Sequence, residues 1–248
     1  MKYTFYLLSI LLLCSCRSSR SMQKEINGMR SDLFYELTSL EYFGKVKDTV
    51  YLDFIDYSNT DYYTTIKRKG GFAIPLYLFN YQKDKFRTRL GEHSLSQLYR
   101  EFLTDALLTE CNSSTCFHLT DNKDHHVPAD SAYRLEVKVR QNETTGGVIL
   151  RESSVIWFEG EFLTFPNCRY RPAQTDLSIA IRLSYRNDCL LDKTYHTQYR
   201  HPRNSRQYAD SHEANQASLD NMAECLSRAT KTIVEDMSQE LHLLMSAK

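Results

Sequence analysis

The sequence predicts an α+β fold, in which a single antiparallel β-sheet carries two helices packed on one face. Apolar and polar residues alternate in several segments, most strictly over 133–140, as they do in half-buried strands. Two other segments, 93–110 and 213–245, repeat their apolar residues at helical spacing. The composition agrees, because 17 Tyr and 12 Phe beside 1 Trp favour strands.

Composition and charge indicate one folded domain, which we place at residues 46–248. The chain has 248 residues, of which 42% are hydrophobic and 25% charged, a balance typical of globular domains rather than disordered chains. Its 31 Lys and Arg equal its 31 Asp and Glu, so the net charge provides no general attraction to nucleic acid. We therefore expect no nucleic-acid partner.

The N-terminus has the pattern of an export signal. Residues 3–13 form an apolar run that is too short to span the ~30 Å core of a bilayer, but it fits the apolar region of a signal peptide. The run ends in Leu13-Cys14-Ser15-Cys16, which resembles the lipobox of bacterial lipoproteins. This resemblance implies that residues 1–15 are removed and that Cys16 carries acyl chains, including palmitate.

Two alternatives remain open at this signal. Cleavage before Cys14 would place Leu12-Leu13 at the boundary, which lacks the small residue of a lipobox. A soluble secretory signal would be cleaved at a neighbouring position without lipidation.

The residues after the lipobox bear on the destination of the protein. Arg17 stands where an Asp would resemble an inner-membrane retention signal, and residues 17–20 lack the acidic cluster associated with surface export in Bacteroidetes. We therefore expect the periplasmic face of the outer membrane. Residues 16–45 are then a lipid-anchored tether with a short segment, 32–37, that packs on the domain. The protein is anchored to the membrane by lipid rather than spanning it.

In the first part of the domain the sequence predicts two strands separated by a basic turn. Residues 50–57 alternate and form the first strand, and residues 67–71 form the turn. Residues 72–81 are almost wholly apolar or aromatic. Pro75 interrupts them, and because proline provides no ladder donor it indicates an edge strand or a bulge.

The rest of the domain begins with a helix over 93–110, where Ser94 and Gln97 have the pattern of a capping box. Further strands are predicted at 115–119, 133–140, 155–165, 177–185 and 190–199, the last two as a hairpin. The chain closes with the helix over 213–245. The buried stripe of this helix consists of Leu219, Met222, Leu226, Ile233, Met237, Leu241 and Leu244.

Five cysteines remain in the domain when the two at the signal are subtracted from seven (7 − 2 = 5). An oxidising compartment permits disulfides, and Cys111 and Cys116 close a short polar loop that is the best candidate for a bridge. Cys168 and Cys189 lie at opposite ends of a predicted strand and would pair directly only if the chain bent. We expect Cys225, which lies among apolar helix positions, to be a small buried hydrophobe.

Catalysis has no support in the sequence, which contains no serine-hydrolase elbow, no phosphate-binding Gly-rich loop and no metalloprotease helix. His125 and His126 lie near several Asp residues, but adjacent side chains on a loop specify no metal geometry. His196, His201 and His212 surround an Arg-rich loop without ligand spacing. We therefore expect no enzyme, no metal site and no cofactor.

The apolar segment 72–81 is a candidate interaction site. It lies beside basic residues, and this combination suits lipid head groups or a protein partner. We expect the segment to belong to the core instead, since a long exposed apolar edge strand invites aggregation. A membrane-facing or partner-facing edge is the alternative. The candidate residues are Phe72, Leu76, Leu78, Lys67, Arg68 and Lys69.

The order of these elements over about residues 46–245 resembles that of the auxiliary lipoproteins of ABC-type lipid transport systems. The resemblance is architectural, and segments 72–91 and 142–175 are additional in this chain. It implies a lipid-anchored periplasmic binding or bridging module, accessory to lipid or solute transport, with an envelope protein as partner. A structural lipoprotein of another envelope complex is the alternative, and a hydrolase without a recognisable motif is the third hypothesis.

Overall fold

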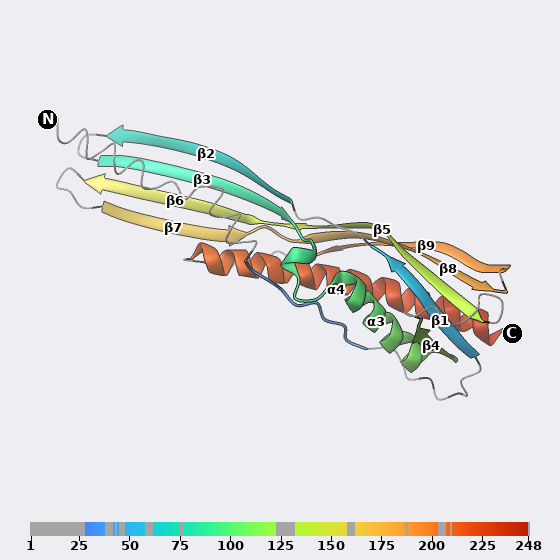
Figure 1. Ribbon diagram of the computed structural model, residues 1–248. Helices are drawn as coiled ribbons and strands as arrows, with labels where there is room; N and C mark the ends of the chain where they lie inside the picture. The colour runs from blue at the N-terminus through green and yellow to red at the C-terminus, as the bar shows by residue number, and fades with distance from the viewer. Residues whose placement is uncertain are drawn as a thin grey trace.

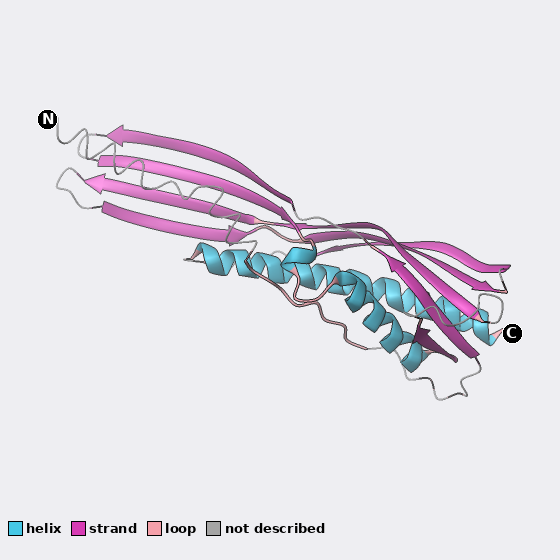
Figure 2. Ribbon diagram, viewed as in Figure 1, coloured by secondary structure: helices cyan, strands magenta, loops and turns pink. Residues whose placement is uncertain are grey.

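The computed structural model describes residues 28–37, 42, 44, 48–57, 62–74, 77–122, 132–157, 162–186, 188–202, 207–208 and 210–247. Figures 1 and 2 show the arrangement of the helices and strands. In chain order these are β1 (Asp48–Asp56), β2 (Tyr62–Ile74), β3 (Tyr77–Arg89), the short 3₁₀ helix η1 (Glu92–Ser94), α3 (Tyr99–Ser114), β4 (Phe117–Asp121), β5 (Tyr133–Gly146), β6 (Val148–Trp157), β7 (Phe162–Tyr170), β8 (Gln174–Tyr185), β9 (Asp188–Arg200) and α4 (Ser211–Ser246).

The nine strands form one sheet with two parts. We call the strands β4, β1, β5, β8 and β9, in this spatial order, the body sheet, and the strands β2, β3, β6 and β7 the arm. The two parts meet where Thr88 and Arg89 of β3 pair with Gly146 and Thr145 of β5. The body sheet lies along α3 and α4, whereas the arm extends beyond the N-terminal end of α4 (Figure 1).

The predicted α+β class is confirmed, but the expectation of a purely antiparallel sheet is wrong. β1 runs parallel to both β4 and β5, while the other strand pairs within the described residues are antiparallel. The parallel pairing follows from the connection, because the β2–β3 hairpin and α3 separate β1 from β4, and parallel neighbours require such a long crossover. Both helices lie on the same face of the body sheet, as predicted (Figure 2).

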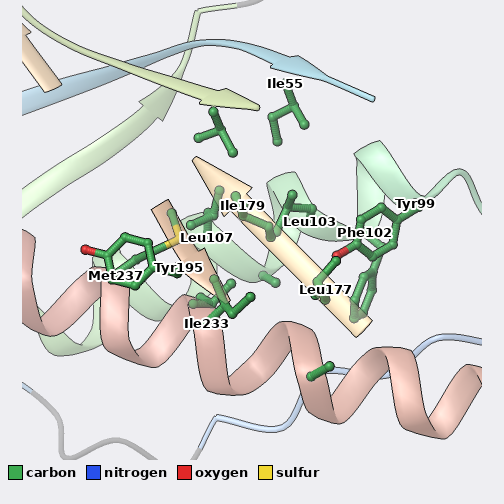
Figure 3. Packing of buried hydrophobic residues seen from close by; sticks show 14 of the residues in the cluster. Ile55, Tyr99, Phe102, Leu103, Leu107, Leu177, Ile179, Tyr195, Ile233 and Met237 are labelled. Atoms are coloured by element: carbon green, nitrogen blue, oxygen red, sulfur yellow. The ribbon is translucent and has the colours of Figure 1, made fainter. Parts of the chain in front are cut away.

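The core fills the space between the body sheet and the two helices (Figure 3). Alternate residues of β8, among them Leu177 and Ile179, are buried, which confirms the predicted strand. Tyr99 of α3 is also buried, and its hydroxyl forms a 2.9 Å hydrogen bond with Thr230 of α4. Six of the seven residues of the predicted α4 stripe are buried, and Leu244 is half-buried; the six are Leu219, Met222, Leu226, Ile233, Met237 and Leu241.

The first helix begins later than the sequence predicts. Ser94 belongs to η1 and does not cap α3, whose N-cap is Leu98 without a side-chain hydrogen bond. The reason is a competing backbone pairing: the amide of Ser31 donates to the carbonyl of Ser94 at 3.0 Å, and the amide of Ser96 donates to the carbonyl of Ser31 at 3.1 Å. These bonds hold the chain extended at the point where the capping box would start a helix.

Residues 28–37 form a strap across α3 and α4, which confirms the predicted packing of 32–37 on the domain. The hydroxyl of Tyr35 donates a 2.6 Å hydrogen bond to the carboxylate of Glu110 on α3, and Glu110 is fully buried. The amide of Phe34 donates to Ser227 of α4 at 3.1 Å. The strap therefore fixes the place where the N-terminal tether reaches the body.

The apolar segment 72–81 forms two strands rather than one. Ile74 of β2 pairs with Tyr77 of β3, so the connection consists of Pro75 and Leu76, which lie outside the described residues. Proline between two strands removes no ladder donor, and this resolves the conflict between Pro75 and a continuous strand. The predicted basic turn at 67–71 is also wrong, because these residues lie inside β2.

Residues 155–165 were likewise expected to form one strand, but they belong to two. The pairing of Ile156 with Phe162 makes β6 and β7 a hairpin, with 158–161 outside the described residues. Apolar residues on both sides of a short polar interval conceal the change of direction in the sequence. The strands at 133–140, 177–185 and 190–199 are confirmed as β5, β8 and β9.

Gly147 connects β5 to β6 at the point where the arm meets the body. Its φ is +140°, and a Cβ atom there would lie 2.0 Å from the carbonyl oxygen of Phe86. The amide of Gly147 donates to the Ser218 hydroxyl of α4 at 3.0 Å, and the Gly147 carbonyl accepts from the amide of Arg171 at 2.6 Å. At Gly146, a Cβ would lie 2.8 Å from Met222 of α4. We call these contacts the junction.

We predict that Gly147→Ala lowers the free energy of unfolding by about 2–4 kcal/mol, because the side chain requires both a rare φ and a displaced β3 backbone. Gly70→Ala is the matched control, since no atom lies within 4 Å of a Cβ at Gly70 in β2. The control should change stability by less than about 1 kcal/mol. Urea unfolding measures both, and equal stability of the two variants would contradict the role of the junction.

Candidate interaction surface

The arm has an inner and an outer face, which the register of its strands defines. Residues in directly paired positions share a face, and successive residues of a strand alternate between faces. Phe86, Val148 and Tyr170 are buried, and α4 packs on β6 and β7 from the same side. We call this side the inner face, and the opposite side the outer face.

Basic residues gather in adjacent rows of the outer face. Arg68, Lys83 and Arg151 occupy directly paired positions on three neighbouring strands. In the next row of the outer face, Lys85 of β3 and Arg169 of β7 both pair with Ile149 of β6. We call these five residues the basic rows. On the inner face the charges are mixed, because Lys67 pairs with Asp84 and the row of Lys69 includes Glu152.

Four of the five basic-row residues have side chains that the structure describes. Lys83, Lys85, Arg151 and Arg169 are half-buried, and they form no ion pair with a residue whose side chain the structure describes. The Nε atoms of Arg151 and Arg169 are buried without a hydrogen-bond partner in the described part of the chain. Like charges in opposed positions destabilise a sheet. The outer face of the arm is therefore suited to bind an anionic group.

The basic charge continues along β3 toward the body. Arg87 is two residues beyond Lys85 and is exposed, and Arg89, which donates a 2.9 Å hydrogen bond to the carbonyl of Asn142, lies two residues further. The regular spacing Lys83, Lys85, Arg87, Arg89 is visible in the sequence as an alternation of basic residues with others. Sequence reasoning missed it because it assigned no strand to 83–89.

The apolar residues at the distal end of the arm stand on both faces. We call three successive cross-strand rows the distal rows, and two of the predicted interaction residues, Phe72 and Leu78, belong to them. Leu76 lies outside the described residues. Within the described chain, the helices do not extend over the distal rows (Figure 1). The rows are Phe72-Phe79-Val155-Leu163, Ala73-Leu78-Ile156-Phe162 and Ile74-Tyr77-Trp157.

Two hollows are lined by strand residues of the sheet. One, of about 430 Å³, is lined at the junction by Arg87, Glu143, Asp176 and Arg200 among others. The imidazole of His196 lies 2.8 Å from the Asp176 carboxylate beside it. The second, of about 450 Å³, lies on the body sheet. It is lined by Asp53, Asp56, Glu136, Val137, Lys138, Arg140, Ala180, Ile181, Arg182 and Asp192. Both linings carry charges of both signs.

The histidines singled out in the sequence are dispersed. His196 contacts Asp176, His201 lies 3.3 Å from Glu224, and His212 lies in the first turn of α4. Among the described residues, no three His, Cys, Asp or Glu side chains come close enough to hold a metal ion. His125, His126 and Cys16 lie outside the described residues. No helix in the described chain is sufficiently long and apolar to cross a bilayer.

The five domain cysteines are free thiols, so the predicted bridge between Cys111 and Cys116 is not formed in this structure. Cys111 is buried on α3, and the Sγ of Cys116 lies 3.7 Å from the carbonyl oxygen of His242. Burial raises the pKa of Cys111 and that of Cys225 to about 12, so both stay protonated at neutral pH. The expectation that Cys225 is a small buried hydrophobe is confirmed.

No family model matches the chain, and no curated protein matches it. One solved structure that is similar is the crystal structure of protein XCC0632 from Xanthomonas campestris, described with the family designation DUF330. It shares 10% sequence identity over 89% of this chain and 98% of that chain, with a TM-score of 0.48.

We predict that a maleimide labels Cys189, which is exposed, and leaves Cys111 and Cys225 unlabelled in the native protein. Mass spectrometry of the digested protein locates the label. In denaturant without reductant, Cys111 and Cys116 should both react. If they react after reduction but not before, the disulfide predicted from the sequence forms in the cell and the free thiols described above do not represent that state.

Proposed function

We propose that this protein is a lipid-anchored binding or bridging module of the bacterial cell envelope, attached through Cys16 at the periplasmic face of the outer membrane. The observation that carries the binding role is the outer face of the arm, where Arg68, Lys83 and Arg151 stand in one row. This face lies opposite the helices, so the packing of the body does not use it. The body is the scaffold that holds it.

The path of the N-terminal chain supports this arrangement. The strap reaches the body on the side of α3 and α4, as the contacts of Tyr35 with Glu110 and of Phe34 with Ser227 establish. Residues 17–27 connect the strap to Cys16, and a chain of this length spans at most about 40 Å. An anchor attached on the helical side leaves the outer face of the arm available to a partner.

We propose that the arm docks a partner rather than carrying an acyl chain. A carrier of lipid would present an apolar groove, whereas the hollow at the junction is lined by Arg87, Glu143 and Asp176. We propose that the protein's role in transport is that of a bridge between other components. A structural role in another envelope complex is the second proposal and uses the same face. We propose no catalytic role.

The anchor is tested by the mass of the mature N-terminus in protein purified from cells. We predict a chain that begins at Cys16 and carries acyl chains. Cys14→Ala is the matched control and should leave this mass unchanged, whereas Cys16→Ala should abolish acylation. Acylation that persists in Cys16→Ala and disappears in Cys14→Ala would move the anchor to Cys14, and the absence of acyl chains from the unaltered protein would refute the proposal.

A further inference from the structure

We propose that β9 pairs antiparallel with β9 of a second copy of this chain, so that the body sheets of the two copies continue as one. The observation that carries this inference is the free edge of β9, which pairs with β8 on one side and, in the described part of the chain, with no strand on the other. The inference goes beyond the proposed function, and it depends neither on acylation of Cys16 nor on what binds the arm.

The chain itself closes two other edges of the sheet. The side chain of Asn112 donates to the carbonyl oxygen of Leu119 at 3.1 Å and accepts from the backbone N–H of Leu119 at 2.8 Å, which covers the edge of β4. The backbone of Tyr208 exchanges hydrogen bonds of 3.0 and 2.9 Å with Cys168 at the edge of β7. Among the residues described, no group forms such bonds at the free edge of β9. A long strand with unpaired N–H and C=O groups is a template for another strand.

The ladder between β8 and β9 shows which groups of β9 point to the free edge. The amide of His201 donates to the carbonyl of Ala173 at 2.9 Å, one step beyond the pair of Arg200 with Gln174. Directly opposed residues of an antiparallel pair are alternately hydrogen-bonded and not, so every second residue of β9 before His201 bonds to β8, and the residues between them direct N–H and C=O outward. The side chains of these outward residues are all exposed, and the residues are Asp192, Thr194, His196, Gln198 and Arg200.

The five outward residues are complementary to themselves when the strand meets its own copy. In an antiparallel pair with its twofold axis at His196, Asp192 of one copy lies opposite Arg200 of the other. Thr194 and Gln198 are opposed in the same way. Opposite charges and hydrogen-bonding side chains in directly opposed positions stabilise a sheet. Moving the axis by one residue in either direction separates the acidic from the basic residue, so the charges select this register.

The charged side chains of β9 are placed to allow this pairing. Neither Asp192 nor Arg200 forms an ion pair with a described side chain of its own copy. Lys193, a residue type that often protects an edge strand, lies on the opposite face and is paired with Glu240 of α4. The two unpaired charges of the strand are therefore the ones that meet across the twofold axis.

The pairing also brings the two hollows of the sheet together. Arg200 lines the hollow at the junction, and Asp192 lines the hollow on the body sheet. Because these two residues face each other across the interface, the junction hollow of one copy borders the body-sheet hollow of the second. Each hollow then gains a charged residue of the other copy at its rim.

Sedimentation equilibrium tests the inference on the chain from residue 17 onward, which lacks the acylated cysteine and keeps the described residues, since these begin at 28. We expect a dimer that Thr194→Pro weakens by about 30-fold or more, because proline removes one outward N–H from each copy and thus two hydrogen bonds of the interface. The ladder with β8 keeps its bonds, so the variant should retain its circular dichroism spectrum. Thr194→Ala is the matched control, which retains the N–H and should dimerise like the unaltered chain.

Crosslinking through cysteines tests the register. In a chain that carries Cys189→Ser, His196→Cys should form a disulfide between two copies on mild oxidation, because directly opposed residues have Cα atoms about 5.5 Å apart, within the range of a disulfide. Gln198→Cys should not form one, since four residues, or about 14 Å, separate Gln198 from the position opposite its copy.

Three results would overturn the inference: a chain that stays monomeric at every concentration, a dimer that Thr194→Pro does not weaken, or a disulfide through Gln198→Cys in place of His196→Cys. A monomeric chain that crosslinks at His196→Cys to another envelope protein in cells would replace the second copy by a strand of that protein. Failure here leaves acylation of Cys16 untouched, since the mass of the N-terminus measures that separately. Thr194→Pro also supplies a monomer in which distances within one chain can be measured.

Discussion

The close approach of two backbones at Gly147 is the constraint on which the rest of the structure depends. β5 ends and β6 begins there, within contact of the Phe86 carbonyl of β3, and no side chain larger than hydrogen fits. Ser218 of α4 bonds to the amide of the same residue at 3.0 Å. One position therefore connects the body sheet, the arm and the long helix, and the arm continues the body instead of forming a separate unit.

The body sheet and the arm, which meet at Gly147, differ in the balance of their positive and negative charges. On the outer face of the body sheet, opposite charges neutralise one another: Arg134 lies 3.0 Å from Asp53, and Lys138 lies 2.7 Å from Asp56. Such pairs contribute little to stability when they are exposed, but they cancel local potential. Among the side chains that the structure describes, Lys83, Lys85, Arg151 and Arg169 of the arm form no such pair. A net charge of zero for the whole chain therefore conceals a local excess of positive charge.

The sequence predicted those elements whose periodicity is governed by a single burial pattern. β5 and β8 alternate because one face meets the helices, and α4 repeats its apolar residues because one stripe meets the sheet. The predictions failed where a residue far away in the sequence determines the local backbone structure. Ser94 pairs with Ser31 of the strap instead of capping α3, and nothing near Ser94 in the sequence reports that contact.

The arm was difficult to predict for a related reason. Apolar residues flank both hairpin connections, 75–76 and 158–161, and hide the two changes of direction in the sequence. The alternation of basic residues in β3 is visible in the sequence. The basic surface also requires Arg151 and Arg169, which lie on the same face only because β3, β6 and β7 pair. The candidate surface is therefore a product of topology.

The central claim is that the junction holds the arm in a fixed direction relative to the body. Pulsed electron spin resonance tests it with one label on Cys189 of the body, which is exposed, and one on Gly70→Cys of the arm. The other domain thiols are buried and should not react. We predict a single narrow distribution of distances, which Gly147→Ala broadens. A broad distribution in the protein that retains Gly147 would contradict the account, because the arm would then move independently of the body.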